Sequence, residues 1–338
     1  MTNISVLGID LGKSTFHAIG HNQQGRVIFK KQFTRTRLLT FLQQLPVCIV
    51  AMESCPSSQW LGRYCQSLGH DTRLLPPQYV KPYVKTNKND FIDADAIAEA
   101  AARPNMRFVP VKSEVQQAQL VSHRLRESFV KQRSACMTQI HAFLLEFGIN
   151  HGKGHSAVRR LPMLLEQISD QLPSALLPAL GQLHQHYLYL CEQIKCLEKR
   201  IQQACKHNDD VTRLMATPGI GIHTPTRLVA EVGNAKRFDS GRQMAAWLGL
   251  TPRQFSTGGK TTLGGISKRG NRALRALFVH GARSLLRFAD KYQHTQLGRW
   301  IFSLKAGKPF NVATVALANK LVRIAWAVLS KQQTFKLV

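Results

Sequence analysis

The sequence predicts a mixed α/β domain followed by a mostly helical remainder, and three observations support this class. Strand-like and helix-like segments alternate over residues 1–110, as in a mixed sheet covered by helices. Residues 111–207 show long helical patterns. Residues 208–338 combine helical segments with glycine-rich turns and end in a long helical stretch. We therefore expect three parts in this chain of 338 residues.

The first part is expected to contain early strands and then alternating helices and strands. A short apolar run predicts the first strand, and a hairpin turning at Gln24-Gly25 follows it. The later strands are short and apolar, while the helices carry apolar residues at helical spacing. The expected strands are 4–10, the two arms of the hairpin at 16–33, 47–53 and 72–76, and the expected helices are 36–45, 57–69 and 93–103.

The middle part contains a stripe of apolar residues with the alternating three-and-four spacing of a coiled coil. One interpretation is a coiled-coil seam that joins two copies of the chain. The other is an ordinary amphipathic helix packed on its own domain. The stripe consists of Leu180, Leu183, Tyr187, Leu190, Ile194, Leu197 and Ile201.

The charge of the chain predicts a polyanionic partner. Forty-six Lys and Arg residues against 19 Asp and Glu give a net charge of +27, and nucleic-acid phosphates are the usual counterpart of such a field. From Gly241 to the end, Asp290 is the only acid against 17 Lys and Arg residues. This last third is therefore the expected nucleic-acid surface, and an acidic membrane surface is the rival partner.

Other features of the composition predict a soluble cytoplasmic protein without a membrane partner. The seven cysteines form no C-x-x-C pair, which is typical of reduced thiols. The N-terminus lacks the pattern of a signal peptide. Lys320 and Arg323 interrupt the apolar stretch 311–330, which we expect to be too polar for a bilayer span.

Acidic residues are scarce and unusually placed in the first part. Asp10, Glu53 and Asp71 are the only acids among the first 89 residues, and the first two end apolar runs. Because these runs are predicted strands of one mixed sheet, we expect Asp10 and Glu53 at neighbouring strand ends. Asp90 and Asp93 follow, on one face of a predicted helix. Together with Asp10 and Glu53 they predict a site for Mg²⁺ or Mn²⁺ that serves phosphodiester chemistry. The alternative is that Asp90 and Asp93 only favour the start of their helix.

Two glycine-containing segments of the last part are candidates for phosphate contacts. The first, Thr217–Gly221, resembles the hairpin of helix-hairpin-helix proteins, whose backbone N–H groups hold a phosphate. An ordinary turn between helices is its alternative. The second, Thr251–Lys260, holds Ser256 and Thr257 beside two glycines.

A serine in this second segment could attack a phosphodiester and hold a DNA end covalently. A passive phosphate-binding turn is the alternative. The residues expected to contact nucleic acid are Gly219, Gly221, Arg253, Gly258, Gly259, Lys260, Lys268, Arg269, Arg272 and Arg275.

Taken in order, these motifs resemble the DEDD transposases of bacterial insertion sequences, of the insertion-sequence-110 type and more closely of its 1111 branch. The resemblance extends over nearly the whole chain. GIDLGK and AMES match its first two acidic motifs, and NKNDFIDADAIAE matches the last two acids. ATPGIG, AAWLGLTP and STGGK…GISKRGNRALR match its C-terminal transposase domain.

This resemblance implies an RuvC-like, RNase H-type domain at 1–110, a helical coiled-coil segment at 111–207 and a small, mainly helical transposase domain at 208–338. It also implies that Asp10, Glu53, Asp90 and Asp93 bind Mg²⁺ and that Ser256 is the nucleophile. Relatives place a serine where Thr257 stands here, so Thr257 is the alternative. A noncoding guide RNA and dimers that pair into tetramers, with active sites shared between subunits, are implied as well.

The expected function is therefore transposition, in which the chain excises and inserts its own element through a serine–DNA intermediate guided by a noncoding RNA. The alternative is a Holliday-junction-type endonuclease that uses only the four carboxylates and water. A basic nucleic-acid binder without catalysis is a third possibility, which carboxylates at the ends of apolar runs argue against.

Overall fold

The computed structural model describes residues 3–85, 89–206 and 208–337. The chain forms two compact units, Met1–Glu114 and Val115–Val338. The expected boundary at residue 207 falls on a position outside the described residues, so the division into three parts stays a prediction.

The first unit contains a five-stranded mixed sheet with the strand order β3-β2-β1-β4-β5. The pairs β1–β2 and β2–β3 are antiparallel, and β1–β4 and β4–β5 are parallel. This confirms the predicted mixed α/β class and each predicted strand. The elements are β1 (Val6–Leu11), β2 (Thr15–His21), β3 (Val27–Thr34), α1 (Arg35–Gln44), β4 (Ile49–Glu53), α2 (Ser58–Ser67), β5 (Asp71–Leu75), α3 (Pro77–Val80) and α4 (Asp90–Ala101).

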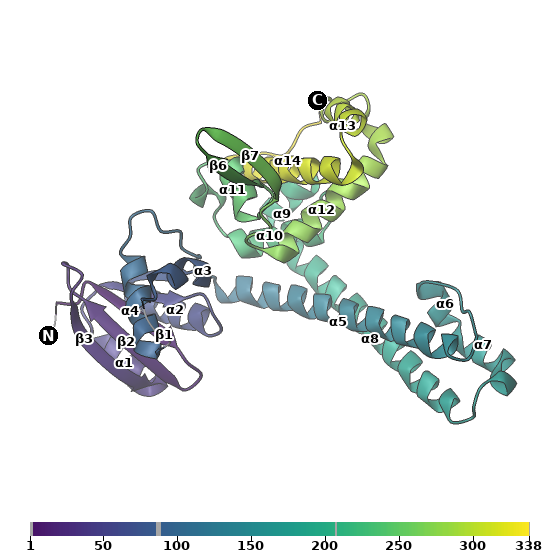
Figure 1. Ribbon diagram of the computed structural model, residues 1–338, viewed down its shortest axis with the longest axis horizontal. Coiled ribbons are helices and arrows are strands. Elements are labelled where there is room, and N and C mark those ends of the chain that lie inside the picture. Colours follow the sequence, from purple (N-terminus) through teal and green to yellow (C-terminus); the bar gives the residue numbers. More distant parts are fainter. Residues whose placement is uncertain (1–2, 86–88, 207, 338) are drawn as a thin grey trace. The chain divides into compact units, whose positions relative to one another are not determined.

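Helices cover both faces of this sheet, and the alternation of side chains along each strand decides which face they meet. On one face, Leu7 and Ile9 of β1 pack with Leu38 of α1 and Leu61 of α2. On the other face, Val6 packs with α4, which lies across β1 in Figure 1. Side chains of a strand point to alternate faces, so residues separated by an even number of positions share a face. Asp10 is four residues from Val6, and its side chain therefore lies on the face that α4 covers.

Gly8 lets α4 approach β1 closely. A Cβ atom at this position would lie 2.2 Å from the carbonyl oxygen of Ala94 and 2.7 Å from the backbone nitrogen of Ala98. Alanines along the inner face of α4 leave room for the same approach, and Ala94 and Ala98 are fully buried. The small residues of β1 and α4 therefore fix the distance between the strand end and the start of the helix.

The second unit is almost entirely helical, with one two-stranded hairpin. Its long helices α5 and α8 lie side by side in Figure 1, and the side chains between them form one apolar cluster. The elements are α5 (Glu114–Leu145), α6 (His155–Arg159), α7 (Leu161–Gln167), α8 (Leu176–Cys205), α9 (Asp209–Met215), α10 (His223–Val232), α11 (Gly241–Trp247), β6 (Pro252–Thr257), β7 (Lys260–Ile266), α12 (Arg272–Arg287), α13 (Gln296–Gly307) and α14 (Phe310–Lys331).

The apolar stripe of the middle part lies on α8 and faces the interior of its own unit. Six of its seven residues are buried within the chain, and Leu183 is half-buried. Leu180, Tyr187 and Leu190 pack with Cys136 and Ile140 of α5. The helix therefore uses the stripe for packing within the chain, as the second interpretation predicted.

A buried histidine, His123 of α5, joins this helix to α10. Its side chain is 4% exposed, and its Nε2 lies 3.0 Å from the Oγ1 of Thr226. Burial, together with the nearby charges of Arg227 and His223, lowers the pKa of His123 to about 4. The neutral imidazole is therefore the form that the fold accommodates.

This depressed pKa predicts that the second unit loses stability in acid. Above about pH 6.5 both states of His123 are neutral, and below about pH 4 both are charged. Between these values only the unfolded chain takes up the proton. The free energy of unfolding therefore falls by about 1.4 kcal/mol for each unit by which the pH is lowered. Chemical denaturation of the full chain between pH 7 and 4 measures this slope. His123→Gln is expected to reduce it, and the same substitution at exposed His186 is the control. An unchanged slope in His123→Gln would contradict the prediction.

In the C-terminal part, α9 and α10 are joined by a tight turn, an arrangement that both the predicted helical hairpin and an ordinary turn between helices would have. The turn between α9 and α10 contains Gly219, whose φ of 79° suits glycine. A Cβ atom there would lie 3.0 Å from the carbonyl oxygen of Gly281 in α12. The hairpin thus packs directly on the backbone of α12 through two glycines.

The last helix, α14, is a core element of this part. Its composition and length would also suit a membrane span, so our expectation that the stretch is too polar for one was wrong. Its inward face, which includes Leu317, Leu321 and Ala325, is fully buried against α11 and α12. Burial of this face in the core of the unit accounts for the apolar sequence of the helix.

Candidate metal centre and nucleic-acid surface

Asp10 and Glu53 lie at the ends of two neighbouring parallel strands, β1 and β4. The register pairs Ile9 with Met52, which places the two acids side by side one residue further on. Both side chains point to the face that α4 covers, because their neighbours Ile9 and Met52 belong to the opposite core. The predicted pairing of these two acids at one edge of the sheet is therefore what the structure contains.

Asp90 and Asp93 reach the same place from the N-terminal turn of α4. Asn89 caps this helix, since its side chain accepts a hydrogen bond of 2.9 Å from the N–H of Phe91. The aspartates are thus not needed as caps. Both lie close enough to Asp10 to act on its ionisation, and Asp93 does the same to Glu53. Asp10 is thus within electrostatic range of the other three acids, and a carboxylate oxygen of Asp90 lies within 4.8 Å of one of its own.

Mutual repulsion and burial oppose the ionisation of this cluster. Burial raises the pKa of Asp10, and the negative charges of Asp90 and Asp93 raise it further. Burial likewise raises the pKa of Glu53, followed by the charges of Asp10 and Asp93. A divalent cation would remove this repulsion, so the cluster has the donor set and the electrostatics of a metal site.

Cys55, two residues beyond Glu53, is not an activated nucleophile. Burial raises the pKa of its thiol, and the charges of Glu53 and Asp10 raise it further. The thiolate is the reactive form of cysteine, and this setting disfavours it.

His17 of β2 also belongs to this cluster, although it is part of none of the predicted sequence motifs. It stands opposite Asp10 in the antiparallel β1–β2 pair. Its Nδ1 lies 3.4 Å from the Oδ2 of Asp90. Donor atoms of Asp10, His17 and Asp90 all lie within 4.8 Å of one another.

In the second unit, Ser256 and Thr257 lie on the exposed hairpin β6–β7. The sequence predicts a glycine-rich turn here but not the two strands. The turn is formed by Gly258 and Gly259, both at positive φ, as a tight two-residue hairpin requires. The Oγ of Ser256 accepts a hydrogen bond of 2.8 Å from the Nε2 of Gln254.

Most of the residues expected to contact nucleic acid are open to solvent in this unit. Arg275 differs from the others, because its Nη1 donates to the carbonyl oxygens of Leu248 and Arg269 at 2.8 and 3.1 Å. It therefore helps to hold the base of the hairpin. Half-buried Gly219 lies in the α9–α10 turn. The exposed residues of the predicted set are Gly221, Arg253, Gly258, Gly259, Lys260, Lys268, Arg269 and Arg272.

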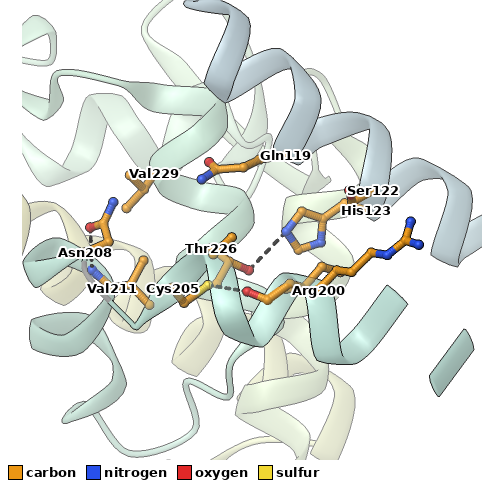
Figure 2. Close-up of a pocket in the computed structure, with 11 residues that line it drawn as sticks. Gln119, Ser122, His123, Arg200, Cys205, Asn208, Val211, Thr226 and Val229 are labelled. Atoms are coloured by element: carbon orange, nitrogen blue, oxygen red, sulfur yellow. Dashed lines mark hydrogen bonds between the residues drawn. The ribbon is translucent and has the colours of Figure 1, made fainter. Parts of the chain in front are cut away.

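A small cavity in the second unit is separate from these features. Figure 2 shows it between α5, α8 and α10, where His123 and Thr226 form their hydrogen bond at its wall. Arg200 and Gln119 also line it. Its volume of about 40 Å³ suits one or two water molecules and is too small for a nucleotide.

Two family models match the chain. A model of DEDD transposases of the IS110 type matches residues 7–149, which include all four carboxylates. A model described as the transposase IS116/IS110/IS902 family matches residues 211–297, which include the α9–α10 turn and the β6–β7 hairpin.

Several transposases are similar to the chain over almost its full length. The transposase for insertion sequence element IS1328 of Yersinia enterocolitica is 44% identical over 99% of both chains. A probable family 20 transposase of Pseudomonas aeruginosa is 42% identical, also over 99% of both. The transposase for insertion sequence element IS1111A of Coxiella burnetii is 38% identical over 99% of this chain and 92% of its own length. The chain therefore belongs to the IS110/IS1111 family of insertion-sequence transposases and is a DNA transposase.

Proposed function

We propose that the chain cleaves and rejoins DNA with Asp10, Glu53, Asp90 and Asp93 as the ligands of a divalent ion, Mg²⁺ or Mn²⁺. The observation that carries this proposal is the convergence of these four carboxylates at one end of the first unit's sheet. The strand order β3-β2-β1-β4-β5 supports an RuvC-like, RNase H-type domain. An ion bound there would neutralise the charge that develops on the scissile phosphate.

In this proposal the carboxylates act as metal ligands that the fold keeps in position. They hold the metal, and Asp10 and Glu53 do so from strand ends whose positions the sheet fixes. Asp90 and Asp93 are carried by a helix that packs on β1 through Gly8. Rigid elements on both sides keep the site ready for the phosphate before DNA arrives.

Ser256 is the proposed nucleophile, with Thr257 as the alternative. Its Oγ attacks the phosphorus, a serine–phosphate bond forms, and the bond to one DNA oxygen breaks. The serine proton is lost, and the departing DNA oxygen gains one. Attack by the freed DNA oxygen of another strand reverses the step and rejoins the backbone. The exposed hairpin supports this role, since a nucleophile for DNA needs an accessible position.

The net charge of +27 supports a polyanionic partner but does not distinguish DNA from RNA. A noncoding guide RNA beside DNA is proposed because the family resemblance implies it. Dimers that pair into tetramers would allow the carboxylates of one subunit to work with the serine of another. A protein that acts on bacterial DNA in this way would work in the cytoplasm.

The proposal predicts a covalent protein–DNA adduct that depends on Ser256. Incubation of the full chain with element-end DNA and Mg²⁺, followed by denaturing electrophoresis, is expected to show a band of protein linked to DNA. Ser256→Ala is expected to abolish the band while thermal stability is unchanged, because the side chain is exposed on a hairpin. Thr257→Ala is the matched control on the same strand. A band that survives in Ser256→Ala and disappears in Thr257→Ala would transfer the role to Thr257.

A second candidate function is an endonuclease that resolves branched DNA with the four carboxylates and water alone. The same acid cluster supports it, because such a reaction needs no serine. Cleavage of branched DNA by both the wild type and the Ser256→Ala, Thr257→Ala double variant, without any adduct, would favour this candidate over the first.

A further inference from the structure

We propose that His17 is a ligand of the divalent ion, which gives the site one imidazole nitrogen beside its carboxylate oxygens. This inference rests on the proposed metal site and adds to it the class of ion that the site prefers. Three observations carry it: the position of His17 in the sheet, its distances to two of the acids, and the contacts that orient its ring.

The position of His17 follows from the β1–β2 pairing. Asp10 and His17 are direct partners in the antiparallel register, so their side chains leave the sheet on the same face. Phe16 and Ala18, the neighbours of His17, belong to the core on the opposite face. His17 thus lies under the first turn of α4, and only 12% of its side chain is exposed.

The distances suit neighbouring ligands of one ion. The Nδ1 of His17 lies 3.4 Å from the Oδ2 of Asp90, and a carboxylate oxygen of Asp10 completes a group within 4.8 Å. Adjacent ligands of a six-coordinate ion, with bonds of about 2.1 Å, lie roughly 3 Å apart. Small side-chain movements would therefore bring the three donors onto one cation.

The ring of His17 is held by Phe91, the residue after Asp90. Their centroids lie 4.7 Å apart, and the rings meet edge to face at 77°. The ammonium group of Lys30 lies 4.6 Å from the centroid of Phe91 and helps to keep that ring in place. His17 therefore presents its Nδ1 towards the acids before any ion binds.

A second histidine on the same strand shows what distinguishes His17. The Nε2 of His21 lies 2.6 Å from the Oδ1 of Asp95, one turn further along α4. This pair resembles His17 and Asp90 in strand, face and partner helix. Within the described residues, however, the three-donor group includes His17 and not His21. His21 is therefore the matched control.

A nitrogen ligand changes the preference for metals. Mg²⁺ favours oxygen ligands and keeps its water, whereas Mn²⁺ and later transition ions also accept imidazole. A site with four carboxylates and one histidine is expected to bind Mn²⁺ more tightly than Mg²⁺. His17 is expected to account for much of that preference.

The test is Mn²⁺ binding to the full chain without DNA, followed by electron paramagnetic resonance. Pulsed spectra of wild type with bound Mn²⁺ are expected to contain the coupling of a coordinated imidazole nitrogen. His17→Gln and His17→Ala are expected to lose this coupling and to bind Mn²⁺ at least about tenfold more weakly. Competition with Mg²⁺ is expected to show a smaller change in Mg²⁺ affinity. His21→Gln is expected to keep both the coupling and the affinity.

The outcomes separate this inference from the proposed metal site. Wild type that binds Mn²⁺ in a manner abolished by Asp10→Asn, but without nitrogen coupling, would overturn the role of His17 alone. The same conclusion follows if the coupling survives in both His17 variants. Wild type that binds no Mn²⁺ would overturn the metal site and, with it, the inference. Circular dichroism of each variant shows that it is folded, and the two substitutions at His17 provide alternatives if one unfolds.

Discussion

Gly8→Ala is expected to lower the free energy of unfolding by about 1–3 kcal/mol and to weaken divalent-ion binding at the same time. The added Cβ atom would lie 2.2 Å from the carbonyl oxygen of Ala94. A backbone atom cannot rotate out of the way as a side chain can, so α4 would have to move off β1. Because α4 carries Asp90 and Asp93, this displacement would open the acid cluster.

Denaturation of the full chain and Mn²⁺ titration measure the two effects. Gly62→Ala in α2 is the matched control, since the atom nearest to its Cβ is a methyl carbon of Val111 at 3.1 Å, which can shift. Alanine also has a higher helix propensity than glycine, which favours the Gly62→Ala variant within α2. Equal stability of the two variants, or full Mn²⁺ binding by Gly8→Ala, would contradict the role of the close approach in positioning the site.

The sequence was informative about the first unit because its signals are local. Each strand is a short apolar run, and acids at the ends of two such runs indicated where the strands stop. Parallel strands bring their carboxyl ends to one edge, so Asp10 and Glu53 could be paired without knowledge of the structure. The helix predicted at 93–103 is likewise present as α4, which begins three residues earlier, at Asp90.

His17 could not be selected from the sequence because a turn at Gly12 decides that it pairs with Asp10, and the apolar pattern does not predict that turn. The chain reverses at Gly12, whose N–H donates to the carbonyl oxygen of Thr15, and this sets the register that pairs Asp10 with His17. A hairpin predicted with its turn at Gly12 would have placed His17 opposite Asp10. The β6–β7 hairpin was missed for another reason. All residues of β6 are exposed, so no alternation of buried and exposed side chains marks it as a strand.

The predicted coiled-coil seam illustrates a limit of periodicity. An apolar stripe with alternating three-and-four spacing predicts that one face of the helix is buried, but it does not identify the helix that packs against that face. Here α5 of the same chain supplies it, with Cys136 and Ile140 packed against the stripe. Assembly into dimers and tetramers stays a prediction that this stripe no longer supports on its own.

Asp10→Asn is expected to abolish DNA cleavage and yet to stabilise the protein in the absence of metal. Cleavage should fall by at least about a hundredfold, because the ion that neutralises the phosphate loses a ligand at the centre of the cluster. The free energy of unfolding in EDTA should rise by about 1 kcal/mol, since a neutral amide of the same shape removes a half-buried charge and its repulsion from Asp90 and Asp93.

The pH dependence of this stabilisation has a definite sign. The pKa of Asp10 is raised in the folded chain, so the charged carboxyl destabilises the fold at neutral pH. As the pH falls through the raised pKa, the folded wild type binds a proton and the penalty disappears. The advantage of Asp10→Asn should therefore be largest near pH 7 and shrink towards the ordinary carboxyl pKa of 3.8.

Asp71→Asn is the control for this experiment, because Asp71 is exposed and accepts hydrogen bonds from Arg73 at 2.7 and 2.9 Å. Loss of that ion pair should not stabilise the chain at any pH. If Asp10→Asn were instead less stable than wild type in EDTA, Asp10 would be a structural residue. If Asp10→Asn is more stable than wild type and does not cleave DNA, the Asp10 charge destabilises the folded protein and is needed for metal binding.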